Sequence, residues 1–193
     1  MALAEAPTGL LTYEEYMAEG EINRRYDILD GVRGYTADAS ARHCDVMLNV
    51  ALLLRGYQRM SRRGRTILPP CDVLISRVPL RTRQPDALFI SHTRFGSRPL
   101  SEMGPLNPAP ELAVEVLVLG ETRNMREKKI TDYCAVGVTE CWVVNMDVET
   151  VEVLRLTPKG PVREALYGSG QTLESLTFPD LTLALDDIFR IEE

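Results

Sequence analysis

The sequence has few of the residues that commonly hold metals or act as nucleophiles. Its 193 residues include four cysteines, two histidines and one tryptophan. The cysteines form no C-x-x-C pair, and the two that lie closest together, Cys134 and Cys141, have no histidine near them. A structural zinc site normally draws on closely spaced Cys and His pairs, so this spacing disfavours one and favours reduced thiols.

Long apolar runs are also missing. No stretch approaches the roughly 20 apolar residues that a membrane-spanning helix needs. The N-terminal segment MALAEAPTGLL has no basic region and only a broken apolar stretch, so it makes a poor secretory signal. We therefore expect a cytoplasmic protein that makes no membrane contact.

Positive charge is not in excess. The 22 Lys and Arg residues are outnumbered by 28 Asp and Glu residues, which gives a net charge of −6 and no general attraction for nucleic acid. Any contact with nucleic acid has to be local. Hydrophobic residues at 45% and charged residues at 26% exclude a disordered chain, and the length favours a single domain over residues 1–193.

Hydrophobic periodicity predicts a chain that mixes helices and strands. Helical spacing predicts helices near residues 12–19, 40–62 and 122–136, and a short amphipathic segment at 183–189. Runs typical of β-strands fall at 26–31, 32–37, 66–77, 86–91, 112–119, 141–146, 150–156 and 163–167. The predicted fold class is therefore α/β (α+β), a mixed β-sheet flanked by helices.

The order of these elements predicts parts of the sheet. Residues 112–146 read strand, helix, strand with short joins, which predicts a βαβ crossover and two parallel strands. We expect the strand at 86–91 beside the one at 112–119, and an antiparallel meander after residue 146. Residues 92–110 hold four prolines and two glycines, which indicates an irregular loop or one short helical turn.

Two acidic residues call for a chemical explanation. Glu115 lies in LAVEVLVL, where the other seven residues are apolar, and a carboxylate buried there needs a partner or a metal. Asp86 begins DALFIS directly after Pro85, and neighbouring strands could bring the two acids together. Such a pair suits Mg²⁺ or Mn²⁺. Alternatively, Glu115 pairs with an internal arginine or faces a wet groove, and Asp86 caps a turn.

The helix that follows Glu115 supplies a cation. Lys129 is four residues from both Met125 and Tyr133, at the edge of the apolar stripe, whereas Lys128 can pair with Asp132 in solvent. Lys129 is thus the more inward lysine and could reach the two acids. An aspartate, a glutamate and a lysine around one metal can activate water and neutralise transition-state charge. The alternative is a lysine that only covers the core edge.

One local basic cluster stands at the end of the predicted long helix. RMSRRGR supplies Arg59, Arg62, Arg63 and Arg65. These arginines could contact backbone phosphates of a nucleic acid, or they form a solvated helix end.

The order of several motifs resembles a known family. TYEEYMAE, YDILDG, QPDALFIS, ELAVEVL, EKKITDYCAVGVTECWVVN and TVEVLRL, spread over nearly the whole chain, resemble the restriction endonuclease family of the Uma-two type. That resemblance implies the PD-(D/E)xK nuclease superfamily, with a restriction-endonuclease-like fold, a divalent metal and phosphodiester hydrolysis. It implies that Asp86, Glu115 and Lys129 are catalytic and that Asp86 and Glu115 bind Mg²⁺ or Mn²⁺. His43 matches a histidine that could contact phosphate or an acid, or only cap its helix.

The chain departs from that family pattern in several places. Val118, Leu119 and Gly120 stand where the family has a Ser-Pro-Ser-type turn, and Met125 and Val32 replace acids. We therefore keep two functional hypotheses. The first is a metal-dependent endonuclease acting on nucleic acid, with DNA as the expected substrate. The second is a weak or inactive nuclease-fold module that binds nucleic acid or protein. A homodimer is expected as well, through the Trp142 strand or the 92–110 loop.

Overall fold

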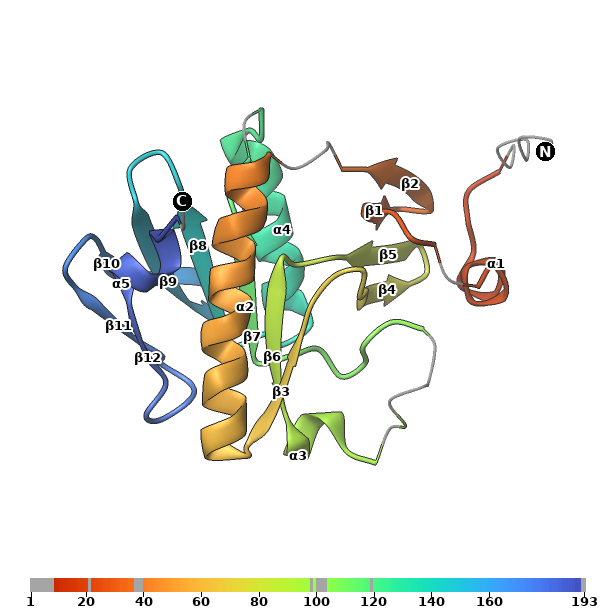
Figure 1. The fold of residues 1–193 in the computed structure, drawn as a ribbon. Helices are drawn as coiled ribbons and strands as arrows, with labels where there is room; N and C mark the ends of the chain where they lie inside the picture. The colour runs from red at the N-terminus through yellow and green to blue at the C-terminus, as the bar shows by residue number, and fades with distance from the viewer. Residues whose placement is uncertain are drawn as a thin grey trace.

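The computed structural model describes residues 9–20, 22–36, 40–97, 99, 104–118 and 120–191 (Figure 1). In chain order its elements are α1 (Tyr13–Ala18), β1 (Tyr26–Leu29), β2 (Val32–Tyr35), α2 (Ala41–Ser61), β3 (Gly64–Ile67), β4 (Val73–Arg77), β5 (Leu80–Arg83), β6 (Ala87–Ser91), α3 (His92–Phe95), β7 (Leu112–Val116), α4 (Arg123–Ala135), β8 (Glu140–Asn145), β9 (Thr150–Thr157), β10 (Gly160–Tyr167), β11 (Thr172–Glu174), β12 (Thr182–Ala184) and α5 (Leu185–Phe189).

A six-stranded mixed sheet forms the centre, in the order β10-β9-β8-β7-β6-β3. β7 and β8 are parallel, with Val114 opposite Trp142, and the other neighbours are antiparallel. The crossover from β7 through α4 to β8 confirms the predicted βαβ unit. The pairing of β6 with β7 and the β8-β9-β10 meander were also predicted correctly.

A four-stranded antiparallel sheet, β2-β1-β5-β4, lies to one side with α1 outermost (Figure 1). Here one prediction was wrong: residues 66–77 are not one strand. The segment divides into β3, which joins the six-stranded sheet, and β4, which joins the four-stranded sheet. Pro69 and Pro70 lie between them and have no N–H to donate, so no ladder can continue through them.

Apolar side chains pack on both faces of the six-stranded sheet. Alternation along a strand sends Val114 and Trp142 to one cluster, and Ala113 and Val143 to the other. The first cluster includes most of the buried apolar residues of α2 and all of those of α5, and the second includes Ile130 and Tyr133 of α4. Glu115 is two residues after Ala113 on β7, so its side chain lies on the same face of the sheet, the face that α4 covers.

Helix α2 has 21 residues and spans roughly 30 Å at 1.5 Å per residue. It begins at an N-cap, Ser40, whose hydroxyl accepts a hydrogen bond from His43 N at 3.2 Å. Figure 1 shows it in front of β3, β6 and β7 of the six-stranded sheet. The two ends of α2 therefore lie in separate regions of the molecule.

The remaining local predictions agree with the structure. α1 carries the predicted capping box between Thr12 and Glu15, and β1 and β2 form the predicted hairpin. Within the 92–110 loop, α3 is a single short helical turn. Across the described part of the chain, no helix is both long and apolar enough to cross a bilayer.

Candidate active site

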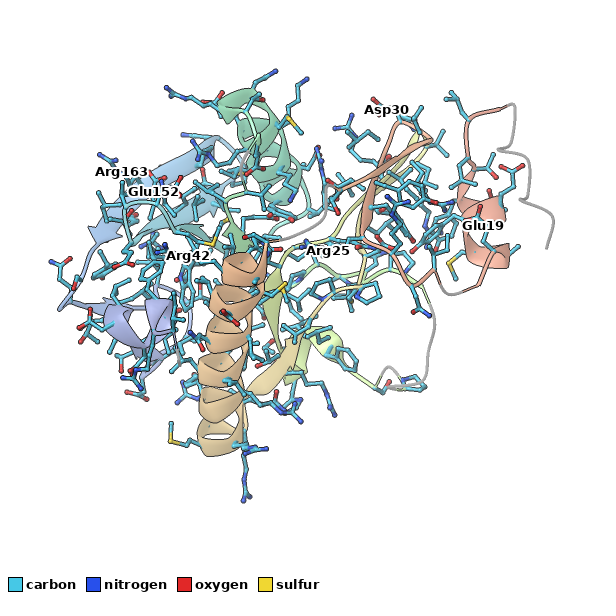
Figure 2. All side chains as sticks on the ribbon, turned by 45° about the horizontal axis from the view of Figure 1, so that its top comes forward. Glu19, Arg25, Asp30, Arg42, Glu152 and Arg163 are labelled. Atoms are coloured by element: carbon cyan, nitrogen blue, oxygen red, sulfur yellow. The ribbon has the colours of Figure 1, made fainter. Side chains whose placement is uncertain are left out.

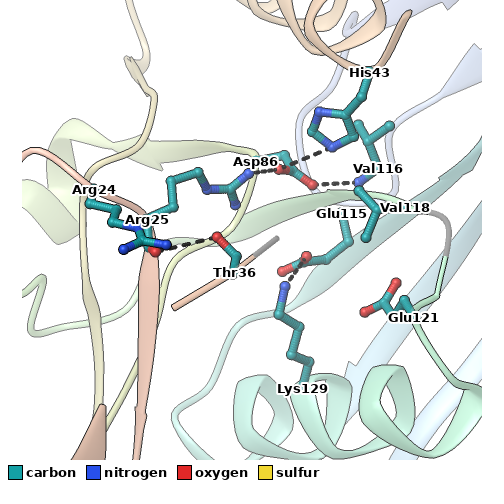
Figure 3. A pocket seen from close by; sticks show the side chains of 10 residues that line it. All are labelled: Arg24, Arg25, Thr36, His43, Asp86, Glu115, Val116, Val118, Glu121 and Lys129. Atoms are coloured by element: carbon teal, nitrogen blue, oxygen red, sulfur yellow. Dashed lines mark hydrogen bonds and ion pairs between the residues drawn. The ribbon is translucent and has the colours of Figure 1, made fainter. Parts of the chain in front are cut away.

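A pocket of about 180 Å³ opens where the six-stranded and four-stranded sheets and the start of α2 meet (Figure 3). Its lining comes from the segments around β1 and β2, from α2, from the facing ends of β6 and β7, and from α4. It is lined by Arg24, Arg25, Thr36, His43, Asp86, Glu115, Val116, Val118, Glu121 and Lys129. All three predicted central residues, Asp86, Glu115 and Lys129, are among them. We call it the Asp86–Glu115 pocket.

Antiparallel pairing brings the two acids together. Asp86 immediately precedes β6 and therefore lies beside the end of β7, where Glu115 stands. The Asp86 N–H donates to Val114 O at 2.9 Å, and Asp86 Oδ2 accepts from Val116 N at 2.7 Å. These two bonds fix the carboxylate against β7. The alternative that Asp86 merely caps a turn is not what the structure shows.

Asp86 is buried beside Arg25 and His43. Its Oδ1 is paired with the Arg25 guanidinium, and His43 Nε2 lies 3.6 Å from the same oxygen. Burial by itself raises the pKa of this carboxyl group. The nearby His43, Arg25 and Lys129 and the Val116 N–H outweigh burial and hold the pKa of Asp86 at about 2. Asp86 is therefore ionised at neutral pH.

Both oxygens of Glu115 are occupied by residues of α4. Lys129 Nζ lies 2.5 Å from Oε2, and Tyr133 Oη donates to Oε1 at 2.5 Å. Lys129 and Tyr133 are four residues apart and so share one face of α4. Burial and the nearby Asp86 raise the pKa of Glu115 to about 7, against the lowering effects of Lys129 and Tyr133. The ion-pair partner of Glu115 is thus a lysine and not an internal arginine, and Glu115 also lines the pocket.

An ion-pair network holds α4 against the four-stranded sheet. Buried Asp132 accepts from Arg83 Nε at 2.7 Å and from Arg81 Nη1 at 2.8 Å. Arg83 Nη1 also donates to Asp27 Oδ2 at 2.8 Å, and Arg81 Nη2 donates to Asp30 at 2.9 Å. The expected pair of Lys128 with Asp132 does not form, because both Asp132 oxygens face the arginines of β5.

The four-stranded sheet positions Arg25 at the pocket. It immediately precedes β1, and Figure 2 places it on the side of that sheet that faces α2, with Asp30 and Glu19 farther out. Its Nη2 donates to Gln84 O at 3.0 Å, and its backbone oxygen accepts from Thr36 Oγ1 at 3.3 Å. Arg25, Tyr133 and Glu121 were not predicted as site residues. Only Tyr133 left a signal in the sequence, since it lies one helical turn after Lys129.

Comparison with known proteins assigns the chain to a family and a fold. The model of the Uma2 family, described as "Putative restriction endonuclease", matches residues 13–186, which is most of the chain. The chain belongs to the Uma2 family. It also resembles the crystal structure of "a putative nuclease belonging to DUF820" from Anabaena variabilis, with a TM-score of 0.71 and 16% identity over 93% of this chain and 97% of that one. That likeness shows a common fold. No curated protein matches the chain.

The Uma2 acids replaced in this chain lie outside the pocket. Val32 on β2 and Met125 on α4 are both exposed, and neither lines the Asp86–Glu115 pocket. Asp27 bonds to Arg83 and to Gln84 N. Glu121 adds a carboxylate to the lining instead. These replacements therefore remove no residue from the described lining.

Restriction-endonuclease-like proteins generally use divalent metal ions. In the portions of the chain that are described, no three His, Cys, Asp or Glu side chains already form a cluster that could hold one. The donor chemistry nevertheless fits: Asp86 and Glu115 offer hard oxygen ligands, and His43 has two buried ring nitrogens with no hydrogen-bond partner among the described residues. In the structure Arg25 is paired with Asp86, and Lys129 is paired with Glu115.

The predicted basic cluster is not at this pocket. Arg59 lies 16 residues after His43 on the same helix, which corresponds to roughly 24 Å, and the other three arginines are farther along. Arg63 is 3.9 Å from Asp180, and the Arg65 guanidinium lies 5.4 Å from the Phe95 ring centroid. The arginines of the pocket itself are Arg24 and Arg25.

Proposed function

We propose that this Uma2 protein is a metal-dependent nuclease that hydrolyses phosphodiester bonds in nucleic acid, with DNA as the expected substrate. The observation that carries the proposal is the convergence of Asp86, Glu115 and Lys129 in one pocket from three separate elements. Family membership supports a nuclease and a nucleic-acid substrate, but the chemistry depends on this geometry.

Asp86 and Glu115 would hold Mg²⁺ or Mn²⁺, because both offer hard carboxylate oxygens. The bound ion would supply a water molecule of lowered pKa and would neutralise charge on the phosphate. Asp86 is already ionised at neutral pH. A bound metal ion would further favour the ionised form of Glu115, whose pKa is about 7 beside Lys129.

Lys129 would act on the attacking water and the phosphate. Neighbouring Glu115, Asp27 and Asp86 outweigh burial and keep its pKa above the ordinary lysine value, so Lys129 is cationic in the working pH range. A buried ammonium group aimed at the carboxylates can orient the water and stabilise the pentavalent phosphate. Tyr133 would keep Glu115 in position through its 2.5 Å hydrogen bond.

Phosphate contacts would come from two regions. Arg24 and Arg25 line the pocket and would bind phosphates next to the scissile bond. Arg59, Arg62, Arg63 and Arg65 would contact the same backbone farther away. A separation of roughly 24 Å corresponds to about seven base pairs along a duplex at 3.4 Å each.

A homodimer is part of the proposal, but not through Trp142. Trp142 is fully buried on a central strand, so it cannot form an interface. Helix α2 offers a self-complementary face instead. Leu48 and Leu52 are 52% and 61% exposed. In an antiparallel pair centred on Leu52, Leu48 faces Gly56 of the second copy, and exposed Asp45 faces exposed Arg59.

The alternative is an inactive module that binds nucleic acid or protein. It is favoured by Arg25 and Lys129, which neutralise the two carboxylates without any metal. The two functions differ in metal affinity. A nuclease binds Mn²⁺ through Asp86 and Glu115, whereas an inactive module need not.

The test is cleavage of double-stranded, single-stranded and branched DNA and of RNA in the presence of Mn²⁺. Glu115→Ala and Lys129→Ala should each lower the rate by about a hundredfold or more. Lys128→Ala is the matched control, because Lys128 is the exposed neighbour on the same helix, and it should cut at the native rate. Equal cutting by all four proteins would refute the assignment. No cutting and no Mn²⁺ binding would favour the inactive module.

A further inference from the structure

His43 is buried at the pocket without the partners that a buried imidazole needs. It is 1% exposed, in the first turn of α2, and its backbone is held by the Ser40 cap. Neither ring nitrogen has a hydrogen-bond partner among the described residues. Leaving a buried polar atom unpaired is costly, so an unpaired imidazole that lines a pocket suggests a ligand that the ring is placed to bind.

The position of Nε2 relative to Asp86 indicates what kind of ligand. The 3.6 Å between His43 Nε2 and Asp86 Oδ1 exceeds an ordinary hydrogen-bond length. Two ligand atoms that bind one metal at about 2.1 Å, with an angle of about 90 to 120° between them, lie roughly 3.0 to 3.6 Å apart. The two atoms are therefore spaced so that one ion can bind both.

The Arg25 guanidinium is itself a cation bound to Asp86 Oδ1. This is the oxygen that His43 approaches, and the Arg25 side chain is partly exposed at the pocket. A metal ion bound at Oδ1 would replace this guanidinium. The site can thus exchange one cation for another without rebuilding the sheet, because Asp86 Oδ2 stays bonded to Val116 N.

We infer that His43 Nε2 is a third protein ligand of the divalent metal, beside Asp86 and Glu115, and that it makes the site selective for transition-metal ions over Mg²⁺. Mg²⁺ prefers oxygen ligands and gives up its water reluctantly, whereas first-row transition metals accept imidazole nitrogen. This inference rests on the metal site of the proposed nuclease and names the class of ion that the site takes.

The first test compares binding of Mn²⁺ and Mg²⁺ to the native protein by calorimetry. We expect tighter binding of Mn²⁺, and we expect His43→Gln to weaken Mn²⁺ by at least about tenfold with a smaller effect on Mg²⁺. His92→Gln is the matched control, because His92 is the other histidine of the chain and is exposed on α3. An unchanged ratio of Mn²⁺ to Mg²⁺ affinity in His43→Gln would overturn the inference.

The second test needs no variant of His43. Electron spin-echo spectroscopy of the Mn²⁺-loaded native protein should show coupling to a histidine nitrogen, and the coupling should change when histidine is labelled with ¹⁵N. His92→Gln should keep this signal. If Mn²⁺ binds in an Asp86-dependent way but no nitrogen coupling appears, or if Mn²⁺ does not bind at all, His43 is not a ligand.

The two proposals fail in different ways. Mn²⁺ bound through His43 without any cleavage would reject the nuclease and leave the metal ligand standing. Cleavage that depends on Glu115 and Lys129, with no nitrogen coupling to Mn²⁺, would reject the role of His43 and leave the nuclease standing.

Discussion

The ion-pair network around Asp132 makes a strong prediction about stability. Asp132 is the only described carboxylate that pairs with both Arg81 and Arg83, and these pairs connect α4 to β5. The Arg83 side chain is 5% exposed. Replacing Asp132 with alanine leaves that buried guanidinium with Asp27 as its remaining partner. Removing one member of a buried pair costs about 3 to 5 kcal/mol.

Because Asp27 stays in place, we expect the lower end, about 3 kcal/mol of unfolding free energy. For a chain of this size that corresponds to a fall in Tm of roughly 6 to 12 °C. Urea titration and thermal unfolding followed by circular dichroism would measure both quantities. Since α4 also carries Lys129 and Tyr133, Asp132→Ala should lower nuclease activity below the unfolding temperature as well.

Asp30→Ala is the matched control for this experiment. Asp30 also pairs with Arg81, but it is largely exposed, and exposed pairs contribute about 0 to 1 kcal/mol. If Asp132→Ala costs no more than Asp30→Ala, then apolar packing alone holds α4 in place and the reasoning from the network is wrong.

Three further predictions concern the site and the dimer. Tyr133→Phe should slow cleavage by about tenfold or more, because it removes a hydrogen bond to a buried carboxylate worth about 1.5 to 3 kcal/mol. Tyr57→Phe is the control: it loses only a bond to a backbone carbonyl and should cut at the native rate. The pKa of Asp86 is lower in the folded protein than in the unfolded chain, so ionised Asp86 contributes stability that is fully present above about pH 4 and is lost as the pH falls through about 2. The urea midpoint of Asp86→Asn should therefore fall less steeply below pH 4 than the urea midpoint of the native protein. Leu52→Lys should shift the protein to monomer in sedimentation velocity, and a native protein that is already monomeric would reject the α2 interface.

Much of the fold could be predicted from local patterns. Apolar residues three and four positions apart marked α2 and α4, and the nearly unbroken apolar run around Glu115 marked a strand buried on both faces. The join of strand, helix and strand fixed the parallel pair, because a helix between two strands carries the chain back across the sheet to start the second strand in the same direction. The prolines at 69 and 70 were recognised as a disturbance, but the sequence did not reveal that they separate two sheets.

The candidate site was predictable where each residue had an unusual local setting. Glu115 is a single acid among apolar residues, Asp86 directly follows a proline, and Lys129 sits at the edge of an apolar stripe. Arg25 and His43 have no such setting. Arg25 belongs to a charged segment like many others, and nothing local separates a buried histidine at a helix start from an exposed one.

The sequence by itself determined most of the helices, the strands from β6 to β10 and the three residues whose types stand out from their surroundings, because these depend on contacts between near neighbours in the chain. The tertiary structure alone decided that Arg25 pairs with Asp86, that His43 faces the same oxygen and that Tyr133 binds Glu115. It also decided that the Arg59 to Arg65 cluster lies at the opposite end of α2 from the pocket. Each of these facts depends on how distant segments pack together, which no local pattern encodes.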